Sequence, residues 1–401
     1  MGRVESQRNY ASAAAPLAAA LGCLQPGIDP VFLTLLSQAG DVPSAAHGII
    51  VGGTQAGAAL GSLAVWRLGA LLPHRAVVAA AAGALGCSLA TPLVDDIVAI
   101  LPIRCCYGFM MGMVYAYTMA SYAARRPNKA FGAVFLIQLL LSTLVSLVLP
   151  ELELALGAET ALATLALVPA AALGALALMS RCTEGAHGPT SIRDGSSTTV
   201  PVAGWALAAA TFWFICSTML VWSFSAGLAT SAGIEDRTIG HAVAVGSIAG
   251  ALTAFAVMRE KSLLPLPVTA ILAGLALASP IVLIAPGDDM AFVVSIILLN
   301  IGSTAIIIRC SGRAVATSAD SRFRTFVACT HSLGLIAGPL LGTGMMALLG
   351  SAGLLAGVIL ALSAGLGAVI LAILAGASPG LGEAVPHLDG NTSPAVRIAL
   401  D

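Results

Sequence analysis

The stretch Ile100–Arg126, ILPIRCCYGFMMGMVYAYTMASYAARR, decides what kind of protein this is. It is long and apolar enough to cross a bilayer as a helix, since about 20 apolar residues span the hydrocarbon core. One arginine, Arg104, lies inside it. A charge at the middle of a membrane helix costs roughly 2.5 to 3.5 kcal/mol on insertion scales, so we expect it only where it has a partner or a function. The stretch therefore predicts a membrane helix that carries part of a polar site.

The overall composition agrees with a membrane protein. Of the 401 residues 58% are hydrophobic and 9% are charged, and the mean hydropathy is +0.96. A net charge of −1 gives no reason to expect a nucleic-acid partner. The eight cysteines lie mostly in apolar runs and lack the paired spacing of metal sites or disulfide frameworks. No catalytic Ser/His/Asp set or phosphate-binding loop can be assembled from the sequence either, so we expect no enzyme, no cofactor and no metal.

Apolar runs of about 17 or more residues predict twelve membrane helices. They lie at approximately 12–37, 45–66, 76–94, 97–123, 130–150, 158–179, 202–232, 238–258, 264–286, 290–312, 325–349 and 352–376. The predicted fold is an all-α membrane protein with two pseudo-symmetric six-helix bundles, an architecture common among secondary transporters. The predicted parts are the N-terminal bundle (1–180), a polar cytoplasmic linker (181–201), the C-terminal bundle (202–376) and a cytoplasmic tail (377–401).

The positive charges predict the orientation in the membrane. All but two of the 18 Lys and Arg residues fall on one side of the predicted spans, the exceptions being Arg104 and Arg237. Cytoplasmic loops carry such an excess of positive charge, so we expect both termini in the cytoplasm. We expect the protein to be embedded in the lipid bilayer of a bacterial inner membrane. We expect it to be a monomer.

Three motifs resemble those of the major facilitator superfamily. RCCYGFMMG (Arg104–Gly112) is similar to the arginine and spaced glycines of that family's fourth helix, and GLIAGPLLG (Gly334–Gly342) resembles its glycine-proline pattern. GSLAVWRLGALLPHR (Gly61–Arg75) resembles its most widespread loop motif, except that Trp66 stands where an acidic residue is usual. The resemblance implies a two-bundle transporter that works by alternating access, without cofactor.

A narrower resemblance is to bacterial sugar- and drug-efflux-type permeases of unassigned substrate. The residues Val221–Phe255 are similar to the second-half pattern of these permeases. The fifth span, Ala130–Pro150, lacks the glycine-proline motif that marks drug/proton antiporters. Drug export is therefore the weaker interpretation within this group.

Asp29 and Arg104 are the candidate proton-coupling residues. Counting about 1.5 Å per helical residue places each about 12 Å below the outer face of the membrane. At matching depth the two charges can favour each other's ionised form. A protonatable acid beside an arginine could act as a proton or anion switch, and the alternative is an ion pair that only joins the first and fourth spans.

The candidate substrate-binding residues cluster around this pair and extend into both bundles. In CLQPGIDPVF (Cys23–Phe32), the prolines and glycine predict a broken helix of the kind that lines cavities, and Gln25 lies four residues before Asp29 on one face. The full set is Gln25, Asp29, Gln55, Arg104, Tyr107, Met111, Gln138, Trp222 and Asn300. Gln25 could instead bond to the backbone at a simple kink. Each of the other amides could be an interhelical hydrogen bond, and each aromatic could be core packing.

Two glycine ladders are predicted to mark the moving interface between the bundles. Small residues at intervals of four let helix backbones approach closely. The candidate interface residues are Gly53, Gly57, Gly61, Gly334, Gly338, Pro339 and Gly342. In the resembled family the second and eleventh spans face each other between the halves. Ordinary tight packing would explain the ladders almost as well.

Together these features predict a secondary active transporter of a small organic solute, anionic or amphipathic, coupled to protons. Its partners would be that solute, protons and the bilayer. The alternatives are an uncoupled facilitator and a non-transporting membrane sensor or scaffold on the same fold. The solute, the direction of transport and the stoichiometry do not follow from the sequence.

Overall fold

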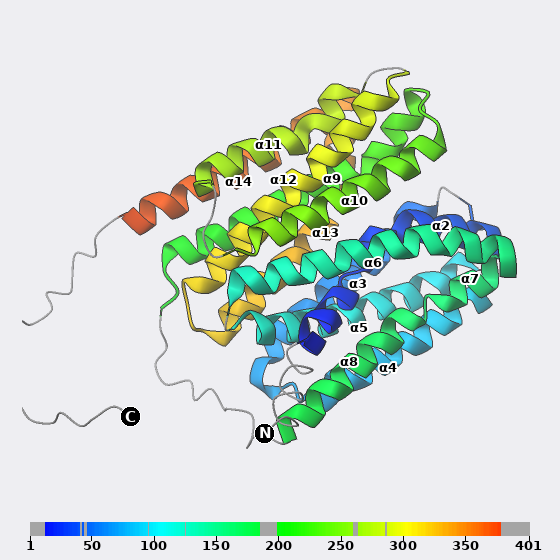
Figure 1. The fold of residues 1–401 in the computed structure, drawn as a ribbon, viewed down its shortest axis with the longest axis horizontal. Coiled ribbons are helices and arrows are strands. Elements are labelled where there is room, and N and C mark those ends of the chain that lie inside the picture. The colour runs from blue at the N-terminus through cyan, green and yellow to red at the C-terminus, as the bar shows by residue number, and fades with distance from the viewer. Residues whose placement is uncertain are drawn as a thin grey trace, which may run out of the picture.

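The computed structural model describes residues 13–40, 42–43, 46–94, 96–124, 126–184, 199–259, 264–284 and 287–377. Within these ranges the regular elements are helices (Figure 1). After a short first helix, Ala13–Gly22, they are α2 (Gln25–Gly40), α3 (His47–Leu68), η2 (Gly69–Leu71), α4 (His74–Ala90), η3 (Thr91–Leu93), α5 (Ile97–Ala123), α6 (Pro127–Leu156), α7 (Ala158–Thr164), α8 (Leu167–Glu184), α9 (Val202–Ser231), α10 (Asp236–Val257), α11 (Leu266–Leu283), α12 (Asp289–Ala316), α13 (Ser321–Leu349), η4 (Gly350–Ala352) and α14 (Gly353–Ala377).

The helices confirm the predicted membrane spans. The described residues contain 11 single helices, or stretches such as Ala158–Ser180, that are long and apolar enough to cross a bilayer. A bent pair, Ala13–Gly22 and Gln25–Gly40, raises the number to 12 if the pair forms one span. Residues 185–198 of the predicted linker and 378–401 of the predicted tail lie outside the described residues.

The first span breaks where the sequence predicted it. Its two helices meet at Cys23 and Leu24 at an angle of 47°. Pro26 has no backbone N–H, so the hydrogen-bond ladder cannot continue through it, and proline is well tolerated in the first turn of a new helix. The Gly27 amide donates to the Leu24 carbonyl at 3.0 Å and closes the turn.

The helices form two bundles, as predicted. Figure 1 shows α2–α8 on one side (the N-terminal half) and α9–α14 on the other (the C-terminal half). One apolar core lies within the N-terminal half, between Ala14 and Leu176. The other fills the C-terminal half and extends into the first through Tyr115, Met119 and Phe131. The halves are therefore packed together through α5 and α6.

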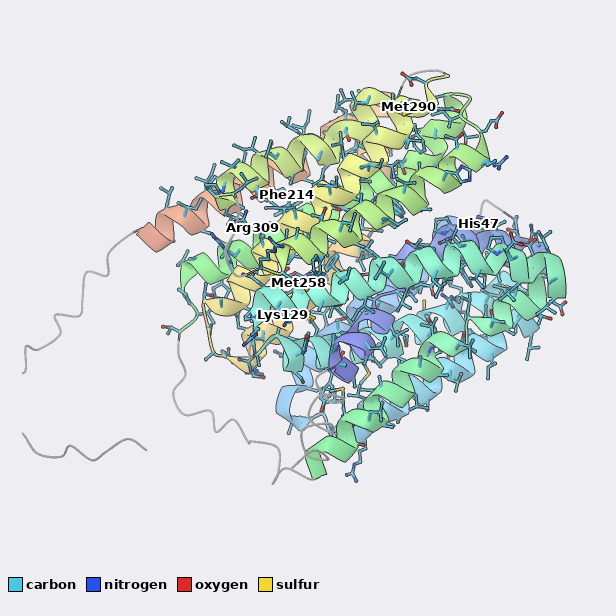
Figure 2. The ribbon with its side chains drawn as sticks, in the orientation of Figure 1. His47, Lys129, Phe214, Met258, Met290 and Arg309 are labelled. Carbon is cyan, nitrogen blue, oxygen red and sulfur yellow. The ribbon has the colours of Figure 1, made fainter. Side chains whose placement is uncertain are left out.

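The two halves meet near one end of the molecule. We call this the inner end; it carries the α3–α4, α5–α6 and α12–α13 connections, and the opposite end is the outer end. Figure 2 shows Lys129 and Met258, from opposite halves, at the inner end, whereas His47 and Met290 mark the outer ends of the two halves. In the described part of the chain, the hydrogen bonds and ring contacts between the halves lie toward the inner end.

Candidate functional site

Asp29 is a buried carboxylate held by two amides. It lies in the second turn of α2 and is 8% exposed. Gln25 Nε2 donates to Asp29 Oδ1 at 2.7 Å, across one helical turn. Gln55 Nε2 on α3 donates to Asp29 Oδ2 at 3.3 Å. Two of the predicted binding residues thus contact the predicted coupling acid directly, and Gln25 bonds to this side chain rather than to the backbone at the kink.

Arg104 is also buried, but it is stabilised in a different way. Its side chain is 3% exposed, and its guanidinium carbon lies 4.3 Å from the Phe32 ring centroid and 4.4 Å from the Tyr107 ring centroid. Cation–π contacts of this kind stabilise a desolvated cation by roughly 2 kcal/mol. Its Nε and Nη2 atoms are buried without a hydrogen-bond partner among the described residues.

The predicted pairing of Asp29 with Arg104 needs a correction in its geometry. The two residues lie close enough to interact electrostatically. Within the described residues, however, no ion-pair contact joins them, because the amides occupy the carboxylate and two rings cover the guanidinium. The site therefore holds two opposite charges that compensate each other at a distance.

A small cavity lies against Arg104 inside the N-terminal half. It leaves about 10 Å³ free, close to the room that one water molecule needs. Its lining comes from α2, α4, η3, α5 and the α7–α8 region: Gln25, Ile28, Phe32, Ser88, Thr91, Arg104, Tyr107, Leu162, Leu165 and Val168. We call it the arginine cavity. Phe32, Ser88 and Thr91 were not predicted; only Phe32 had a signal, since it lies three residues after Asp29 on one helix face.

A second cavity lies between the halves and is called the central cavity here. It leaves about 20 Å³ free. Its lining is mostly apolar: Gly22, Cys23, Gln25, Pro26, Thr54, Gln55, Ala58, Tyr107, Gly108, Met111, Gly112, Tyr115, Ser332 and Leu335. Ser332 and Leu335 come from the C-terminal half. Gln25 and Tyr107 line both cavities, so they form the partition between them.

The other predicted binding residues lie away from Asp29. Gln138 on α6 accepts a hydrogen bond from Cys23 Sγ at 3.4 Å, so it stands behind the lining of the central cavity. Asn300 donates to the Ile296 carbonyl of its own helix at 3.0 Å and packs against Gly246. Trp222 is partly buried against the C-terminal core. Asn300 and Trp222 line neither cavity, and these contacts correspond to the packing roles left open for them.

The glycine ladders lie inside the halves, which corrects their predicted position. A methyl group at Gly57 or Gly61 would collide with the α5 backbone at Cys105 or Phe109. A methyl group at Gly338 would approach the Cys216 carbonyl and the Leu220 amide of α9 at 2.5 and 2.7 Å. The remaining ladder residues follow the same pattern: Gly53 faces α5, and Gly334 and Gly342 face α9. Pro339 lies within α13 and is half-buried.

The second and eleventh spans do contact each other, through other residues. Ser62 and Ser332 share a hydrogen bond with 2.9 Å between their Oγ atoms, and Cys329 Sγ donates to the Ser62 carbonyl at 3.0 Å. Trp66 lies 5.5 Å from Phe326 between ring centroids. Trp66 stands where the resembled motif has an acid, and in this chain it packs against the other half.

His331 is a buried member of this contact region that lies among aromatic rings. Its ring lies 5.5 Å from Phe131 in a stacked geometry, and 6.0 and 5.6 Å from Tyr115 and Phe135, all from the N-terminal half. Its Nε2 lies 3.0 Å from Ser311 Oγ in the C-terminal half. We call the contacts of Ser62, Trp66, Phe326, Cys329, Ser332 and His331 across the halves the inner seam. The contacts of His331 are those of a packing residue.

The chain is similar to known proteins in structure but not in sequence. In sequence, no family model matches the chain, and no curated protein matches it. In structure, the chain is similar to the human organic anion transporter MFSD10 (TETRAN), with a TM-score of 0.67 at 14% identity over 91% of this chain and 99% of that one. It is also similar to a bacterial homologue of the iron transporter ferroportin in an outward-facing state, with a TM-score of 0.64 at 14% identity over 93% and 99%.

These similarities confirm the predicted fold class. The matched structures are membrane transporters, and they cover both halves of the chain rather than one bundle. In the described ranges, no group of three or more His, Cys, Asp or Glu side chains could hold a metal ion. The chain is an all-helical, multi-pass membrane protein whose fold is like that of these two transporters.

Proposed function

We propose that the protein is a secondary active transporter of a small organic solute, anionic or amphipathic, coupled to protons and working by alternating access. The observation that carries the proposal is a pair of buried, opposite charges in the N-terminal half, whose neighbours Gln25, Gln55 and Tyr107 line the central cavity. Charged side chains are costly inside a membrane and usually serve a pathway. Asp29 is the proposed proton carrier, and Arg104 is the proposed electrostatic partner of the solute.

The proposed coupling follows from how each charge is held. While Asp29 is ionised, its charge offsets that of Arg104 and the site is neutral overall. When Asp29 takes a proton, Arg104 loses this compensation and can attract an anion more strongly. Because the guanidinium has two unpartnered donor nitrogens, it can bind that anion without first breaking a hydrogen bond within the described residues. Proton and anion would then bind together.

The apolar lining of the central cavity favours a solute with an apolar body. Tyr107, Met111, Tyr115 and Leu335 offer aromatic, thioether and aliphatic surface there. The similarity in fold to a human organic anion transporter is in keeping with a solute of this kind. The free volume of about 20 Å³ is far below that of such a solute, so its binding requires the halves to move apart.

Alternating access is supported by the position of the inner seam. The positive-inside rule places the inner end in the cytoplasm. Contacts between the halves that gather at this end correspond to a molecule closed toward the cytoplasm, and one of the matched transporters was captured facing outward. We propose that the seam opens when the solute is released, and that a bacterial inner membrane is the protein's location.

Transport in proteoliposomes tests the proposal. The purified protein is reconstituted with pyranine inside, and 4-phenylbutyrate, an anion with a flat apolar body, is added under an inward proton gradient. We expect labelled 4-phenylbutyrate to accumulate together with internal acidification, and both to stop with a protonophore. The matched amide, 4-phenylbutyramide, is the uncharged control and should not be transported. Protein-free liposomes correct for passive permeation of the protonated acid.

The rival functions predict different outcomes. An uncoupled facilitator would equilibrate 4-phenylbutyrate without accumulating it, and the protonophore would have no effect. A sensor or scaffold would move neither solute nor protons beyond the protein-free control. Because 4-phenylbutyrate is one member of a class, a panel of carboxylates of different length is measured alongside it. If none of these carboxylates is transported, the proposal that the solute is an anion is wrong.

A further inference from the structure

The arginine cavity is separate from the path between the halves. All of its lining residues belong to the N-terminal half, and the side chains of Gln25 and Tyr107 divide it from the central cavity. A solute that only crosses between the halves has no need of such a side chamber. Its presence beside the most deeply buried charge of the N-terminal half raises the question of what occupies it.

The guanidinium in this cavity is fixed in place but incompletely bonded. Its central carbon lies over the rings of both Phe32 and Tyr107. Rings in this arrangement do not satisfy donors at the edge of the guanidinium, and Nε and Nη2 remain unpartnered within the described part of the chain. These two nitrogens form one edge of the planar fork, the edge with which arginine binds carboxylates in a bidentate way.

Among the described residues, no acid bonds to these two nitrogens. Asp29 interacts with Arg104 electrostatically, but its two oxygens accept from Gln25 and Gln55 instead. A buried donor without a partner is costly, and a buried charge is more so. An anion at the free edge would relieve both costs, and the apolar side chains Leu162, Leu165 and Val168 would strengthen its attraction by keeping water away.

The size of the cavity limits what can bind. Its free volume of about 10 Å³ is about the room that one water molecule needs, so it could accept a halide ion or the two oxygens of a carboxylate after small side-chain shifts. A sulfate or phosphate ion has more oxygen atoms than this space can receive. Ser88 and Thr91 add hydroxyl groups to the lining. The chemistry is therefore that of a small monovalent anion.

We infer that the arginine cavity is a binding site for a small monovalent anion at the Nε and Nη2 edge of Arg104. A chloride-sized ion occupies it when no solute is present. The carboxylate end of the solute replaces that ion, entering from the central cavity between Gln25 and Tyr107. The second part rests on the proposed function, whereas the first stands on the geometry of the cavity alone.

Bromide is the probe for the site, because it resembles chloride and scatters anomalously. The purified protein is kept in sodium sulfate, and its thermal unfolding is followed as bromide is added. We expect saturable stabilisation, and one anomalous peak in the arginine cavity of crystals soaked in bromide. Arg104→Gln should lose both. Arg309→Gln is the matched control, since Arg309 is a second buried arginine with an unpartnered Nη2 but lies in the C-terminal half and donates to Thr269.

Further variants separate binding from folding. Phe32→Leu keeps the charge but removes one ring, and we expect a weaker bromide response because the guanidinium is less firmly held beside the cavity. Tyr107→Phe keeps both rings and should retain the affinity. If Arg104→Gln does not fold, these two variants and the crystals of the wild type still decide the question. A wild-type protein without a bromide response, and without a peak in the cavity, would overturn the inference.

Competition between bromide and 4-phenylbutyrate tests whether the carboxylate of the solute binds at the same site as an inorganic anion. With 4-phenylbutyrate present, the bromide response should shift to higher bromide concentration, while 4-phenylbutyramide should leave it unchanged. A bromide peak that 4-phenylbutyrate does not displace would overturn replacement by the solute and leave a site for inorganic anions. These readouts need no transport: binding without transport would count against the proposed function alone, and coupled transport without binding would count against this site alone.

Discussion

The carboxylate of Asp29 accepts hydrogen bonds from two neutral amides, and this arrangement has a chemical consequence. Glutamine side chains can also accept a hydrogen bond from a protonated carboxyl group, since each carries a carbonyl oxygen beside its NH₂ group. Gln25 and Gln55 can therefore hold Asp29 in place in either protonation state. A direct bond to Arg104 could not do this, because a guanidinium has no acceptor.

Asp29→Asn should abolish proton-driven accumulation and leave solute exchange in place. Asparagine has nearly the same shape and keeps a carbonyl oxygen for the two glutamines, but it cannot carry a proton. We expect accumulation of 4-phenylbutyrate to fall to the level set by the membrane alone, while counterflow in preloaded liposomes persists. Asp289→Asn is the control, because Asp289 is an exposed acid at the outer end. If Asp29→Asn still accumulates solute like the wild type, Asp29 is not the coupling acid.

Arg104→Lys should recover little of the function that Arg104→Ala loses. A lysine keeps the charge, but it lacks the planar fork and cannot stack between Phe32 and Tyr107 in the same way. We expect at least a tenfold lower transport rate at subsaturating 4-phenylbutyrate, which corresponds to about 1.4 kcal/mol. The rate is normalised to the amount of folded protein measured by size-exclusion chromatography. Full transport by Arg104→Lys would show that Arg104 acts only through its positive charge.

At this scale the sequence predicted which residues meet but not how they bond. A spacing of four residues was enough to place Gln25 beside Asp29, and helical rise was enough to bring Asp29 and Arg104 to one region. The direction of the arginine side chain depends on Phe32 and Tyr107, whose rings come together only in the folded bundle. Spacing along a chain contains no such information.

The glycines of α3 and α13 make their helix pairs unusually close, which makes their mutational effects predictable. Gly57→Ala should lower the free energy of unfolding by about 1 to 3 kcal/mol, the usual cost of overpacking. Its new methyl group would meet the α5 backbone at Cys105, which cannot turn aside as a flexible side chain can. Gly52→Ala on the same helix is the control, because no atom lies within 4 Å of its added methyl group. Thermal unfolding in detergent measures both.

The second ladder allows the same comparison in the other half. Gly338→Ala should destabilise α13 against α9, whereas Gly344→Ala meets no atom within 4 Å and should be neutral or slightly stabilising. Equal stabilities for the two variants would mean that the close contact between α13 and α9 is absent. The ladder itself was visible in the sequence. Its partner was not, because a glycine every four residues specifies a close approach without specifying which neighbouring helix approaches.

The contact between α3 and α13 should be a moving one. Cysteines replacing Ser62 and Ser332, in a background with Cys329→Ser, should form a crosslink on oxidation, since the two hydroxyl oxygens are 2.9 Å apart. A crosslinked molecule cannot open the inner seam, so we expect transport to stop on oxidation and to return with a reducing agent. Each single-cysteine variant should be unaffected by the same treatment. Transport that continues in the crosslinked protein would exclude opening at this seam.

For the molecule as a whole, the orientation in the membrane is the first prediction to test. Glu159→Cys, in the first turn of α7, lies at the outer end, and Ala319→Cys lies in the α12–α13 connection at the inner end. In intact cells a membrane-impermeant maleimide should label the first variant only. In inside-out vesicles it should label the second only. The reverse pattern would invert the orientation and every statement about inward and outward access.

The two-bundle architecture was predictable from the sequence because hydrophobic length and the placement of charge are properties of the chain itself. The conformation of the molecule, in which the halves meet near one end, was not predictable from the sequence. Which end of the molecule is closed depends on Ser62 meeting Cys329 and Ser332 across the halves, and Ser62 lies 267 and 270 positions before them in the chain. Residues of this kind are ordinary small side chains with no distinguishing local pattern.

The aromatic surroundings of His331 have a further consequence for how transport should respond to temperature. Opening the inner end would bring the rings of Tyr115, Phe131 and Phe135 into water. Exposure of apolar surface carries a positive heat-capacity change, so the enthalpy of the opening step should itself rise with temperature. An Eyring plot of the transport rate should therefore be curved when opening limits the rate. Replacing Phe131 and Phe135 by alanine should straighten it.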